Sequence, residues 1–502
     1  MHWVWIFLCF FWSCSSDSKT SKRSLRIAFS QEPTSLDPRL AQTLNGSNIC
    51  RMLFEGLMGF DSNGALVPTL AEQVQISEDH LVYEFHLRKA KWSDGSEVCA
   101  QDFIDSWKVA LSPNFPAANV DQLFPIRGAK RAKSGEIAVD EIGLHSSNPS
   151  ILIVELEAPT PYFLKLCSLP AYFPTPKGKT VTIDSWISNG PYLLDRWIHQ
   201  DRIVLKKNPF YWASEQIASP SVELSFLEPE TALQLFDADQ LDWVGSPTSY
   251  LPLTSLPALV ERGGYQKFPL LGTSFLRINT RLAKLSDAKV RQTLASAIHR
   301  EELTEILLHG SQIPAYRFVP PVLGLMNPEL IDKDLEKESL KDTVLSLLYA
   351  EDPRARSVVQ AIQGQLMQEL SIKVELEPAE IRVYYERIRK GEYELALGSW
   401  IADFDDPANF LDLFRDHSSS GNMTGWESKD YLEQLKLSDL CVGEERFKRL
   451  AEAEKILMRE APIIPIFHFQ MNYLQKSDLK GIVLLPIGLM DYRWATIGEK
   501  TQ

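Results

Sequence analysis

No single hydrophobic core can take up a chain of 502 residues, and this length is the strongest constraint on the fold. A core stops growing at about 250 to 300 residues, beyond which a chain divides into separately packed units. Because 44% of the residues are hydrophobic, the chain has enough apolar side chains for two or three cores. No segment of about 20 to 50 residues recurs, so we expect globular lobes and not a repeat array.

The charge balance excludes one class of partner. The formal net charge is -14 and the pI is about 5.3. A protein that binds the phosphate backbone of nucleic acid needs a concentrated positive face, and the sequence contains no basic stripe. We therefore expect no nucleic acid partner.

The first 23 residues are typical of a secretion signal followed by a polar tether. The apolar run within residues 1–13 is about eleven residues long, shorter than the roughly twenty needed to span a bilayer. It ends at Trp12, two residues before Cys14, and the segment resembles a lipoprotein signal in which Cys14 is the lipidated residue. Stable attachment to a membrane requires more than one acyl chain. The alternatives are ordinary secretion, an uncleaved hydrophobic tail and a misassigned start site.

Four further cysteines, Cys50, Cys99, Cys167 and Cys441, lack the spacing of a metal site. In an oxidising compartment they could form up to two disulfides in any of three pairings, and the sequence does not select one. Buried free thiols are equally compatible with the pattern.

Hydrophobic periodicity predicts alternating strands and helices, and therefore an α/β fold. Period two over residues 81–87 predicts a strand, and a turn follows at 93–96. The spacing of Phe103, Trp107 and Leu111 predicts a helix that ends before Pro113. Another strand is predicted around residues 203–207.

Three longer patterns follow in the second half of the chain. One helix is expected from a cap at Ser286 to Gly310. Residues 372–400 read as strand, helix and strand, which predicts a right-handed βαβ crossover. A last helix is expected at about 444–460, with Phe447, Leu450 and Leu457 facing inward.

Motifs for catalysis are absent from the sequence. It contains no G-x-S-x-G elbow, no H-E-x-x-H helix and no phosphate-binding loop of the G-x-x-x-x-G-K-[ST] type. His468 stands in an apolar run and is expected to be a core residue. We therefore expect no enzyme activity, no catalytic residue, no metal and no cofactor.

Three aspartates follow the second strand of the predicted βαβ unit. Their spacing does not fit a calcium loop, and Asp405 and Asp406 are expected to be solvated turn residues. Asp403 lies near the carboxyl end of a strand, where α/β sheets place ligands. In a cleft that loses water on closing, this carboxylate would pair strongly with an ammonium group, such as the α-amino group of a peptide.

A series of short motifs extends in order from about Ser24 to Trp494. They lie at residues 32–38, 53–57, 68–72, 83–88, 91–95, 102–103, 189–192, 207–212, 278–280, 290–291, 297–300 and 400–404. Each motif alone is weak, but their order and spacing are specific. Through them the chain resembles the oligopeptide/dipeptide-binding proteins of ABC importers, which form solute-binding protein family 5.

The resemblance implies a two-lobed periplasmic-binding-protein clamp with an extra domain inserted in lobe I. Lobe I would comprise residues 24–46, 185–271 and 481–502, after the signal and tether of residues 1–23. The inserted domain would span residues 47–184, and lobe II would span residues 272–480. Two segments would cross between the lobes.

The resemblance also implies where a ligand binds. In oligopeptide binders of this family the peptide lies extended and forms hydrogen bonds with backbone groups of both lobes. These bonds do not depend on the side chains of the peptide. The corresponding edges here are Glu32, Pro33 and Thr34 in lobe I, and Gly398, Ser399 and Trp400 in lobe II. Asp403 matches the aspartate that receives the α-amino group of the ligand.

One position departs from the pattern. Leu397 stands where some oligopeptide binders carry an arginine that anchors the carboxylate of the ligand. Arg382, Arg387 and Arg389 are substitutes on a predicted helix, although we expect them to face solvent. The length of the ligand is therefore left open.

The implied function is that of an extracytoplasmic, lipid-anchored monomer in the periplasm or at the cell surface. It would capture short peptides by closing its lobes and deliver them to the membrane subunits of an ABC importer. The same fold could instead hold a cell-wall peptide, haem, a nickel complex or a sugar. A secreted hydrolase and a folding helper are alternatives of another class.

Overall fold

The computed structural model of the chain describes residues 23–176, 186–325, 340, 342–415 and 421–498. Strands and helices alternate through most of this range, so the predicted α/β class is confirmed. Cys14, the proposed lipidation residue, lies outside the described residues.

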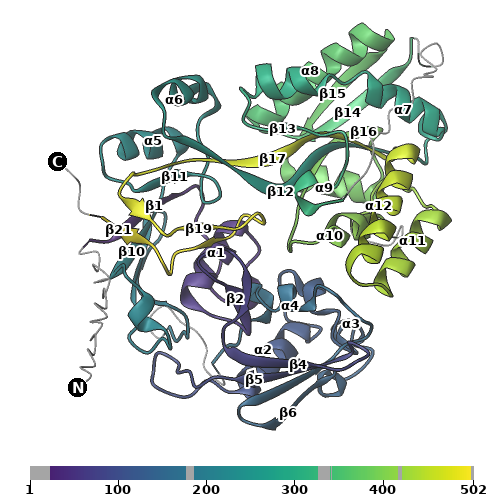
Figure 1. Cartoon of the computed structure of the whole chain (residues 1–502). Helices are drawn as coiled ribbons and strands as arrows, with labels where there is room; N and C mark the ends of the chain where they lie inside the picture. Colours follow the sequence, from purple (N-terminus) through teal and green to yellow (C-terminus); the bar gives the residue numbers. More distant parts are fainter. Residues whose placement is uncertain (1–22, 177–185, 326–339, 341, 416–420, 499–502) are drawn as a thin grey trace, which may run out of the picture.

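One mixed sheet of eleven strands forms the centre of the molecule (Figure 1). Its strands are β1 (Leu25–Phe29), β8 (Tyr192–Ile198), β9 (Arg202–Lys207), β10 (Ser221–Phe226), β11 (Trp243–Gly245), β12 (Tyr265–Ile278), β13 (Ile313–Pro314), β14 (Val344–Ala350), β15 (Lys373–Ala379), β16 (Leu395–Ile401) and β17 (Ile463–Gln475). The spatial order is β15-β14-β16-β12-β17-β11-β1-β10-β9-β8, and β13 pairs with β17 beside this path. The strand predicted at 203–207 is β9.

Two long antiparallel strands join the two ends of this sheet. β12 has 14 residues and β17 has 13. One end of β17 pairs with β11, whereas the far half of β12 pairs with β16 (Figure 1). The proposed boundary between residues 271 and 272 lies within β12, and the proposed boundary after residue 480 lies beyond the end of β17. The division into lobes at these residues remains a prediction.

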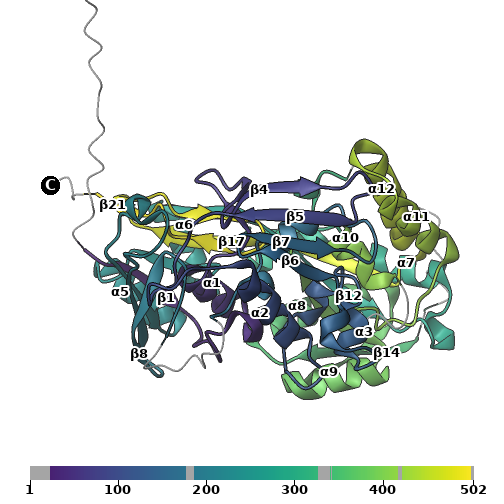
Figure 2. The same cartoon turned by 90° about the horizontal axis from the view of Figure 1, so that it is seen from below.

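A second sheet lies within residues 47–184, the proposed inserted domain. It contains β4 (Ala71–Ile76), β5 (Val82–Leu87), β6 (Leu144–Asn148) and β7 (Ile151–Glu155), in the order β4-β5-β7-β6. Figure 2 shows this sheet from below, and α2 (Ala100–Leu111) packs against β6 and β7. Tyr83 and Phe85 on β5 are buried, as are Phe103, Trp107 and Leu111 on α2. The predicted strand and helix are both confirmed.

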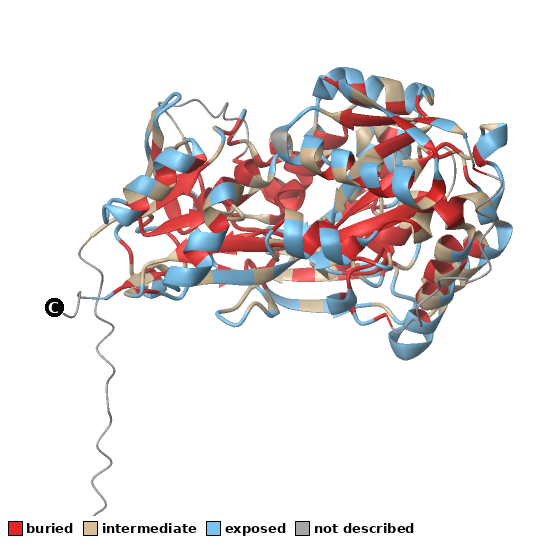
Figure 3. Ribbon diagram, turned by 90° about the horizontal axis from the view of Figure 1, so that it is seen from above, coloured by how far each residue is buried: buried red, intermediate tan, exposed pale blue. Residues whose placement is uncertain are grey.

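The remaining elements surround these two sheets. Three short strand pairs are β2 (Met58–Phe60) with β3 (Leu66–Pro68), β18 (Leu479–Lys480) with β21 (Thr496–Ile497), and β19 (Val483–Leu484) with β20 (Met490–Asp491). The other helices are α1 (Leu44–Leu53), α3 (Ala129–Lys133), α4 (Phe163–Leu166), α5 (Pro229–Asp237), α6 (Leu256–Arg262), α7 (Ala288–Ser296), α8 (Pro353–Leu370), α9 (Ile381–Lys390), α10 (Ala408–Leu411), α11 (Lys429–Asp439) and α12 (Gly443–Glu460). Buried residues concentrate on the central strands, while the outer helices present exposed faces (Figure 3). A search of the described helices finds none with the length and apolarity to cross a membrane.

The single helix predicted from Ser286 to Gly310 is wrong. The chain forms α7, capped by the side chain of Asp287 and not by Ser286, and then a separate π-helix, Glu302–Leu307. Arg300 satisfies carbonyl groups at the break. Its guanidinium donates to the carbonyl oxygens of Ala295 and Ile298, at 3.2 and 3.0 Å, so these groups have a donor where the helix ends.

The predicted βαβ unit is present, with one additional strand between its two strands. β15, α9 and β16 follow one another in the chain, and β14 lies between the two strands and runs parallel to both. The last predicted helix is α12, in which Leu450 and Leu457 are fully buried. Phe447 is 37% exposed, so the prediction that it faces inward is wrong.

The four cysteines within the described residues are all free. Cys50 and Cys167 are buried, whereas Cys99 and Cys441 are partly buried. The disulfide alternative is therefore not realised in this structure, and burial raises the pKa of the Cys167 thiol.

Candidate functional site

The end of β16 is an unpaired edge of the central sheet. On one side, Gly272–Phe275 of β12 pair with residues 398–401 of β16. On the other side, β14 pairs only with Leu395 and Ala396. No strand in the described part of the chain covers that side of Gly398, Ser399 and Trp400.

The direction of the backbone groups on this edge follows from the register. The amide of Ala402 donates to the carbonyl oxygen of Leu271 at 2.7 Å, which places the even-numbered residues of β16 against β12. Because alternate residues of an antiparallel strand point to opposite sides, the N–H and C=O groups of Ser399 and Ile401 point to the open side. The carbonyl oxygen of Leu397 also points there and accepts the hydroxyl of Tyr384 at 2.6 Å.

Asn409 fixes the two residues that the sequence analysis placed at the end of this strand. Its Oδ1 accepts the indole N–H of Trp400 at 2.9 Å and the backbone N–H of Asp403 at 3.2 Å. Asn409 is only 8% exposed, so these hydrogen bonds are shielded from water. Asn409 was not predicted from the sequence, since an asparagine at the start of a short helix carries no specific signal.

Asp403 lines a cavity of about 260 Å³. The walls come from the three proposed parts of the chain: residues 38–44 and 487–489 of lobe I, residues 47, 118–122 and 169–171 of the inserted domain, and residues 401–403 of lobe II. Asp403 forms no ion pair within the described residues. The cavity thus contains a carboxylate that no cation of the described residues neutralises.

The surroundings disfavour the charged form of this carboxylate. Burial and, to a smaller extent, the nearby Asp121 carboxylate raise the pKa of Asp403 to about 6, although hydrogen bonds from Asn409 and Gln122 act in the opposite direction. A carboxylate with this environment gains more from an incoming cation than a solvated one does. Asp121 and Gln122 were also missed, because they belong to a segment about 280 residues away in sequence.

Glu32, Pro33 and Thr34 do not line this cavity. The carboxylate of Glu32 accepts the indole N–H of Trp197 at 2.6 Å and lies 2.7 Å from Nδ1 of His199. Burial raises the pKa of Glu32, but the hydrogen bonds from His199, from the amide of Gln200 and from Trp197 together lower it. Its side chain is therefore already engaged within lobe I, and contact of this segment with a ligand stays a prediction.

The two aspartates that follow Asp403 differ in their surroundings. Asp405 is exposed, as predicted. Asp406 is buried, so its prediction as a solvated residue is wrong. Its carboxylate accepts both terminal nitrogens of Arg446, at 2.7 and 2.9 Å, and caps the amide of Ala408 at 2.9 Å. A buried aspartate with a bidentate arginine partner is a structural group.

A contact between the proposed inserted domain and lobe II lies beside the same loop. The rings of Tyr162 and Phe404 stack at a centroid distance of 4.4 Å and an interplanar angle of 16°. Lys165 donates to the carbonyl oxygen of Asp405 and lies 3.9 Å from its carboxylate. The loop after β16 therefore contacts both the cavity and the opposite wall of the cleft.

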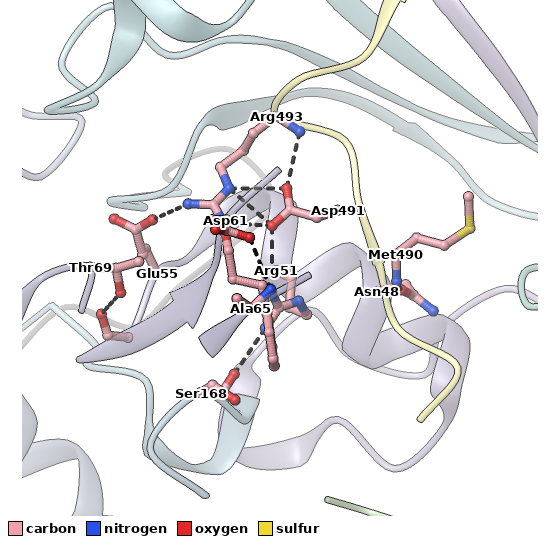
Figure 4. Close-up of polar contacts among 12 residues, drawn as sticks. Asn48, Arg51, Glu55, Asp61, Ala65, Thr69, Ser168, Met490, Asp491 and Arg493 are labelled. Atoms are coloured by element: carbon pink, nitrogen blue, oxygen red, sulfur yellow. Dashed lines mark hydrogen bonds and ion pairs between the residues drawn. The ribbon is translucent and has the colours of Figure 1, made fainter. Parts of the chain in front are cut away.

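A buried charged cluster brings together residues of two of the sequence motifs, those at 53–57 and 207–212, and the C-terminal segment (Figure 4). Arg493 pairs with Glu55 at 3.0 Å and with Asp491 at 2.6 Å, and Arg51 lies 3.6 Å from Asp491. The hydroxyl of Tyr211 donates to Glu55 at 2.7 Å. Burial raises the pKa of Glu55, whereas the neighbouring Arg493 and Arg51 lower that of Asp491 despite its burial. These groups hold α1 against the C-terminal segment.

The described residues contain no group of three or more His, Cys, Asp or Glu side chains that could hold a metal ion. His468 is 2% exposed and shares a hydrogen bond of 2.8 Å between its Nδ1 and the hydroxyl of Thr273. Burial lowers the pKa of His468 to about 3, so it is neutral at physiological pH. Its prediction as a core histidine is confirmed.

Known proteins resemble the chain over nearly its whole length. Residues 65–422 match the family described as bacterial extracellular solute-binding proteins, family 5 Middle. The oligopeptide-binding protein OppA of Bacillus subtilis (strain 168) is 32% identical, over 95% of this chain and 93% of the relative. The structure of the Escherichia coli murein tripeptide binding protein MppA matches with a TM-score of 0.81 and 27% identity, over 96% of this chain and 100% of that one. Haemophilus influenzae OppA in complex with RPPGFSPFR matches with a TM-score of 0.77 and 26% identity, over 92% of this chain and 96% of that one.

Proposed function

Because this chain belongs to family 5 of the bacterial extracellular solute-binding proteins and has their two-lobed clamp fold, we propose that it captures short peptides between its lobes for an ABC importer. The observation that carries this proposal is the unpaired edge of β16, which ends at Asp403 in the cavity between the lobes. The family is one of solute binders, which supports a role in binding.

The peptide would lie along the open side of β16. The outward N–H and C=O groups of Ser399 and Ile401 provide the hydrogen bonds of an added strand. Every residue of a peptide offers the same amide groups, so this contact gives affinity without selecting a sequence. Trp400 would pack beside the ligand in the orientation that Asn409 fixes.

The amino terminus of the peptide would pair with Asp403. An ammonium group in the cavity neutralises a carboxylate that has no cation of its own among the described residues. Such a charge-assisted hydrogen bond contributes about 1.5 to 3 kcal/mol. Glu32, Pro33 and Thr34 would supply the facing edge from lobe I once the lobes close.

Binding would shift an equilibrium between open and closed lobes. The closed form gains the contacts that need both lobes at once, so a ligand that touches both selects it. The membrane subunits of the importer would recognise the closed form, and a separate ATPase would supply the energy for transport.

Calorimetry with free and N-acetylated peptides tests the pairing at Asp403. We expect N-acetylation to weaken binding to the wild type by about ten- to a hundredfold. In Asp403→Asn the free and acetylated peptides should bind with nearly equal, weakened affinity. Asp405→Asn, which removes an exposed carboxylate from the same loop, is the matched control and should behave as the wild type. Equal affinity of the wild type for both peptides contradicts the pairing.

Native mass spectrometry of the purified protein tests the ligand class itself. Under gentle ionisation, the wild type should be detected with peptides of a few residues still bound. The same masses show whether the protein is the expected monomer. A protein that carries no peptide and binds none on addition is not a peptide receptor.

We also propose that the protein is extracytoplasmic and anchored to a membrane through lipid on Cys14. The sequence of residues 1–23 supports this placement, since an apolar run ends two residues before that cysteine. Cys14→Ser should move the protein from the membrane fraction to the soluble fraction of expressing cells and should abolish incorporation of labelled palmitate. Retention of the label in the variant would refute the anchor.

A further inference from the structure

The two strands that join the ends of the central sheet, β12 and β17, contain one interruption of their pairing. The register shifts between Pro269 and Thr273 of β12, so residues 270–272 lie opposite Phe469 of β17 alone. Such a bulge disrupts the ladder of hydrogen bonds and allows the strand to bend. The interruption includes the proposed lobe boundary within β12, so it is the point at which we expect the lobes to rotate against each other.

Leu271, in the middle of the interruption, forms its backbone hydrogen bonds outside the β12–β17 ladder. Its N–H donates to the carbonyl oxygen of Pro486 at 2.6 Å, and its carbonyl oxygen accepts the amide of Ala402 at 2.7 Å. Pro486 belongs to the proposed lobe I and Ala402 to the proposed lobe II. The pairing of β12 with β17 therefore does not by itself fix the angle between the lobes.

The other edge of β17 has a gap at the same level. β12 occupies one edge, whereas the other edge pairs with β11 at residues 473–475 and with β13 at residues 467–468 (Figure 1). Between these strands, the N–H of Gln470 donates to Oε1 of Gln312 at 3.0 Å, and its carbonyl oxygen accepts the side-chain amide of Asn472 at 2.9 Å. Side chains thus satisfy the backbone in a gap that no strand of the described residues fills.

Residues 310–313 span the interruption from one side to the other. Ile313 pairs with His468, on the lobe II side of the interruption. The side chain of the preceding residue, Gln312, binds Gln470 on the lobe I side. Two adjacent residues of the proposed lobe II therefore hold β17 on both sides of the point at which the strand pair can bend.

Two further hydrogen bonds extend this contact toward lobe I. The carbonyl oxygen of Ser311 accepts the side-chain amide of Asn472 at 3.0 Å, and that of Gly310 accepts a hydrogen bond from Nζ of Lys267 at 2.5 Å. Ser311 and Gln312 are buried, so the inner bonds are shielded from water. Because the partners lie on the lobe I side, a change in the angle between the lobes alters these distances.

We propose that residues 310–312, the hinge brace, stabilise the arrangement of the lobes in which the walls of the cleft touch. The inference rests on the proposed function, in which the lobes close over a peptide. In the structure the walls touch through the stacked rings of Tyr162 and Phe404 while the bonds of the hinge brace are formed. Loss of the hinge brace therefore favours the open form and lowers the affinity for peptide, although Gln312 does not line the cavity of Asp403.

Gln312→Ala tests the hinge brace by calorimetry with the pentapeptide Ala-Ala-Tyr-Ala-Ala and by small-angle scattering, both on the full chain. Loss of the neutral hydrogen bond to Gln470 should weaken binding by about two- to tenfold. Without peptide, the radius of gyration should exceed that of the wild type. Gln363→Ala is the matched control, because this glutamine donates to the carbonyl oxygen of Val374 at 2.7 Å entirely within lobe II. It should leave both quantities unchanged.

Lys267→Met is a second variant that does not disturb a buried group. Lys267 is exposed, so its replacement should not prevent folding. The loss of its bond to Gly310 should change the affinity and the radius of gyration in the same direction as Gln312→Ala does, but by less, because this bond is exposed to water. If Gln312→Ala does not fold, Lys267→Met decides.

Amide exchange at Gln470 distinguishes the hinge brace from a merely structural contact. In the closed form the N–H of Gln470 is bonded to Gln312, so the pentapeptide should slow its exchange in the wild type, and by more than it slows exchange in β5 of the inserted domain. In Gln312→Ala the exchange at Gln470 should be fast with and without peptide. A contact that does not depend on the angle between the lobes would give equal exchange in the wild type with and without peptide.

Three results would overturn the proposal: wild-type affinity and radius of gyration in both variants, a more compact form of Gln312→Ala, or exchange at Gln470 that the pentapeptide does not alter in the wild type. In each of these the wild type still binds the pentapeptide, so the proposed function stands. A wild type that binds no peptide removes the proposed function, and this inference with it.

Discussion

Asp403 is a carboxylate whose surroundings oppose its own charge. Its pKa in the folded protein is about 6, against 3.8 for the same group in solution. The folded state therefore binds the proton more tightly than the unfolded state does. The contribution of this group to stability is fully present below about pH 4 and is lost as the pH rises through about 6.

Replacement of Asp403 by asparagine should remove this pH dependence. Without ligand, Asp403→Asn should be more stable than the wild type at pH 8, by about 1 to 3 kcal/mol, and the difference should become small at pH 4. Thermal unfolding of both proteins at the two pH values measures it, with Asp405→Asn as the control for the loss of one negative charge. An equal difference at pH 4 and pH 8 would show that the carboxylate is not desolvated.

The cluster around Arg493 makes a second prediction at the scale of single residues. Arg493→Met leaves the carboxylates of Glu55 and Asp491 buried with one cation fewer (Figure 4). Removal of one partner from a buried ion pair costs about 3 to 5 kcal/mol. We therefore expect a clearly lower midpoint of thermal unfolding. Lys390→Met breaks an exposed pair with Glu386 and should leave the midpoint unchanged. Equal midpoints for the two variants would contradict a structural role of the cluster.

At the scale of elements, the break after α7 shows how one side chain redirects a helix. The residues from 286 to 310 have the apolar spacing of one helix, but the amide of His299 donates to the side chain of Gln365 at 3.0 Å. The Nε of Arg300 donates to the carbonyl oxygens of Ala315 and Pro465, at 2.7 and 2.8 Å. The guanidinium thus binds the backbone of β17 and of the residue that follows β13.

Arg300→Met should therefore destabilise the protein strongly. The variant leaves several buried carbonyl groups without a donor, and each lost charged hydrogen bond costs about 1.5 to 3 kcal/mol. A fall in the midpoint of thermal unfolding, together with faster amide exchange in α7, is the expected result. The control Arg356→Met alters an exposed ion pair on α8 and should change neither quantity. Unaltered exchange in α7 would mean that the helix breaks for another reason.

At the scale of the whole molecule, the loop after β16 connects the cavity of Asp403 to a contact with the proposed inserted domain. Asp403 lines the cavity, and the next residue, Phe404, stacks on Tyr162 of the proposed inserted domain. A ligand that orders this loop also orders the contact between the two walls. The aromatic pair should therefore stabilise the closed form.

Phe404→Ala should weaken peptide binding, although Phe404 has no proposed contact with the ligand. An aromatic pair contributes about 0.5 to 1.5 kcal/mol beyond the burial of its surface, so we expect about a two- to tenfold lower affinity, mainly through faster release. Stopped-flow release of a labelled peptide measures this rate, and small-angle scattering should show a more open form without ligand. Phe210→Ala removes a 44% exposed ring from lobe I and should leave both measurements unchanged. An unchanged release rate in Phe404→Ala would show that the stacking of Tyr162 and Phe404 does not stabilise the closed form.

Several motifs that identify the family from the sequence stabilise the fold and do not contact the cleft. Gly190 shows why such a motif is specific: a Cβ at this position would lie 2.6 Å from the backbone nitrogen of Phe54. The adjacent Asn189 exchanges two hydrogen bonds with the backbone of Glu55, at 3.1 and 3.2 Å. The motifs at residues 53–57 and 189–192, more than a hundred residues apart, therefore contact each other in the fold.

The sequence by itself determined the α/β class, most strands and helices, and the family, because these depend on periodicity and on the order of motifs along the chain. Only the tertiary structure decided which charged groups are compensated. Asp406 and Asp403 look alike in the sequence, but Arg446, forty residues away, pairs with the first, while the second lines a cavity. The partner of a charge is set by packing between distant segments, and the local pattern of residues does not encode it.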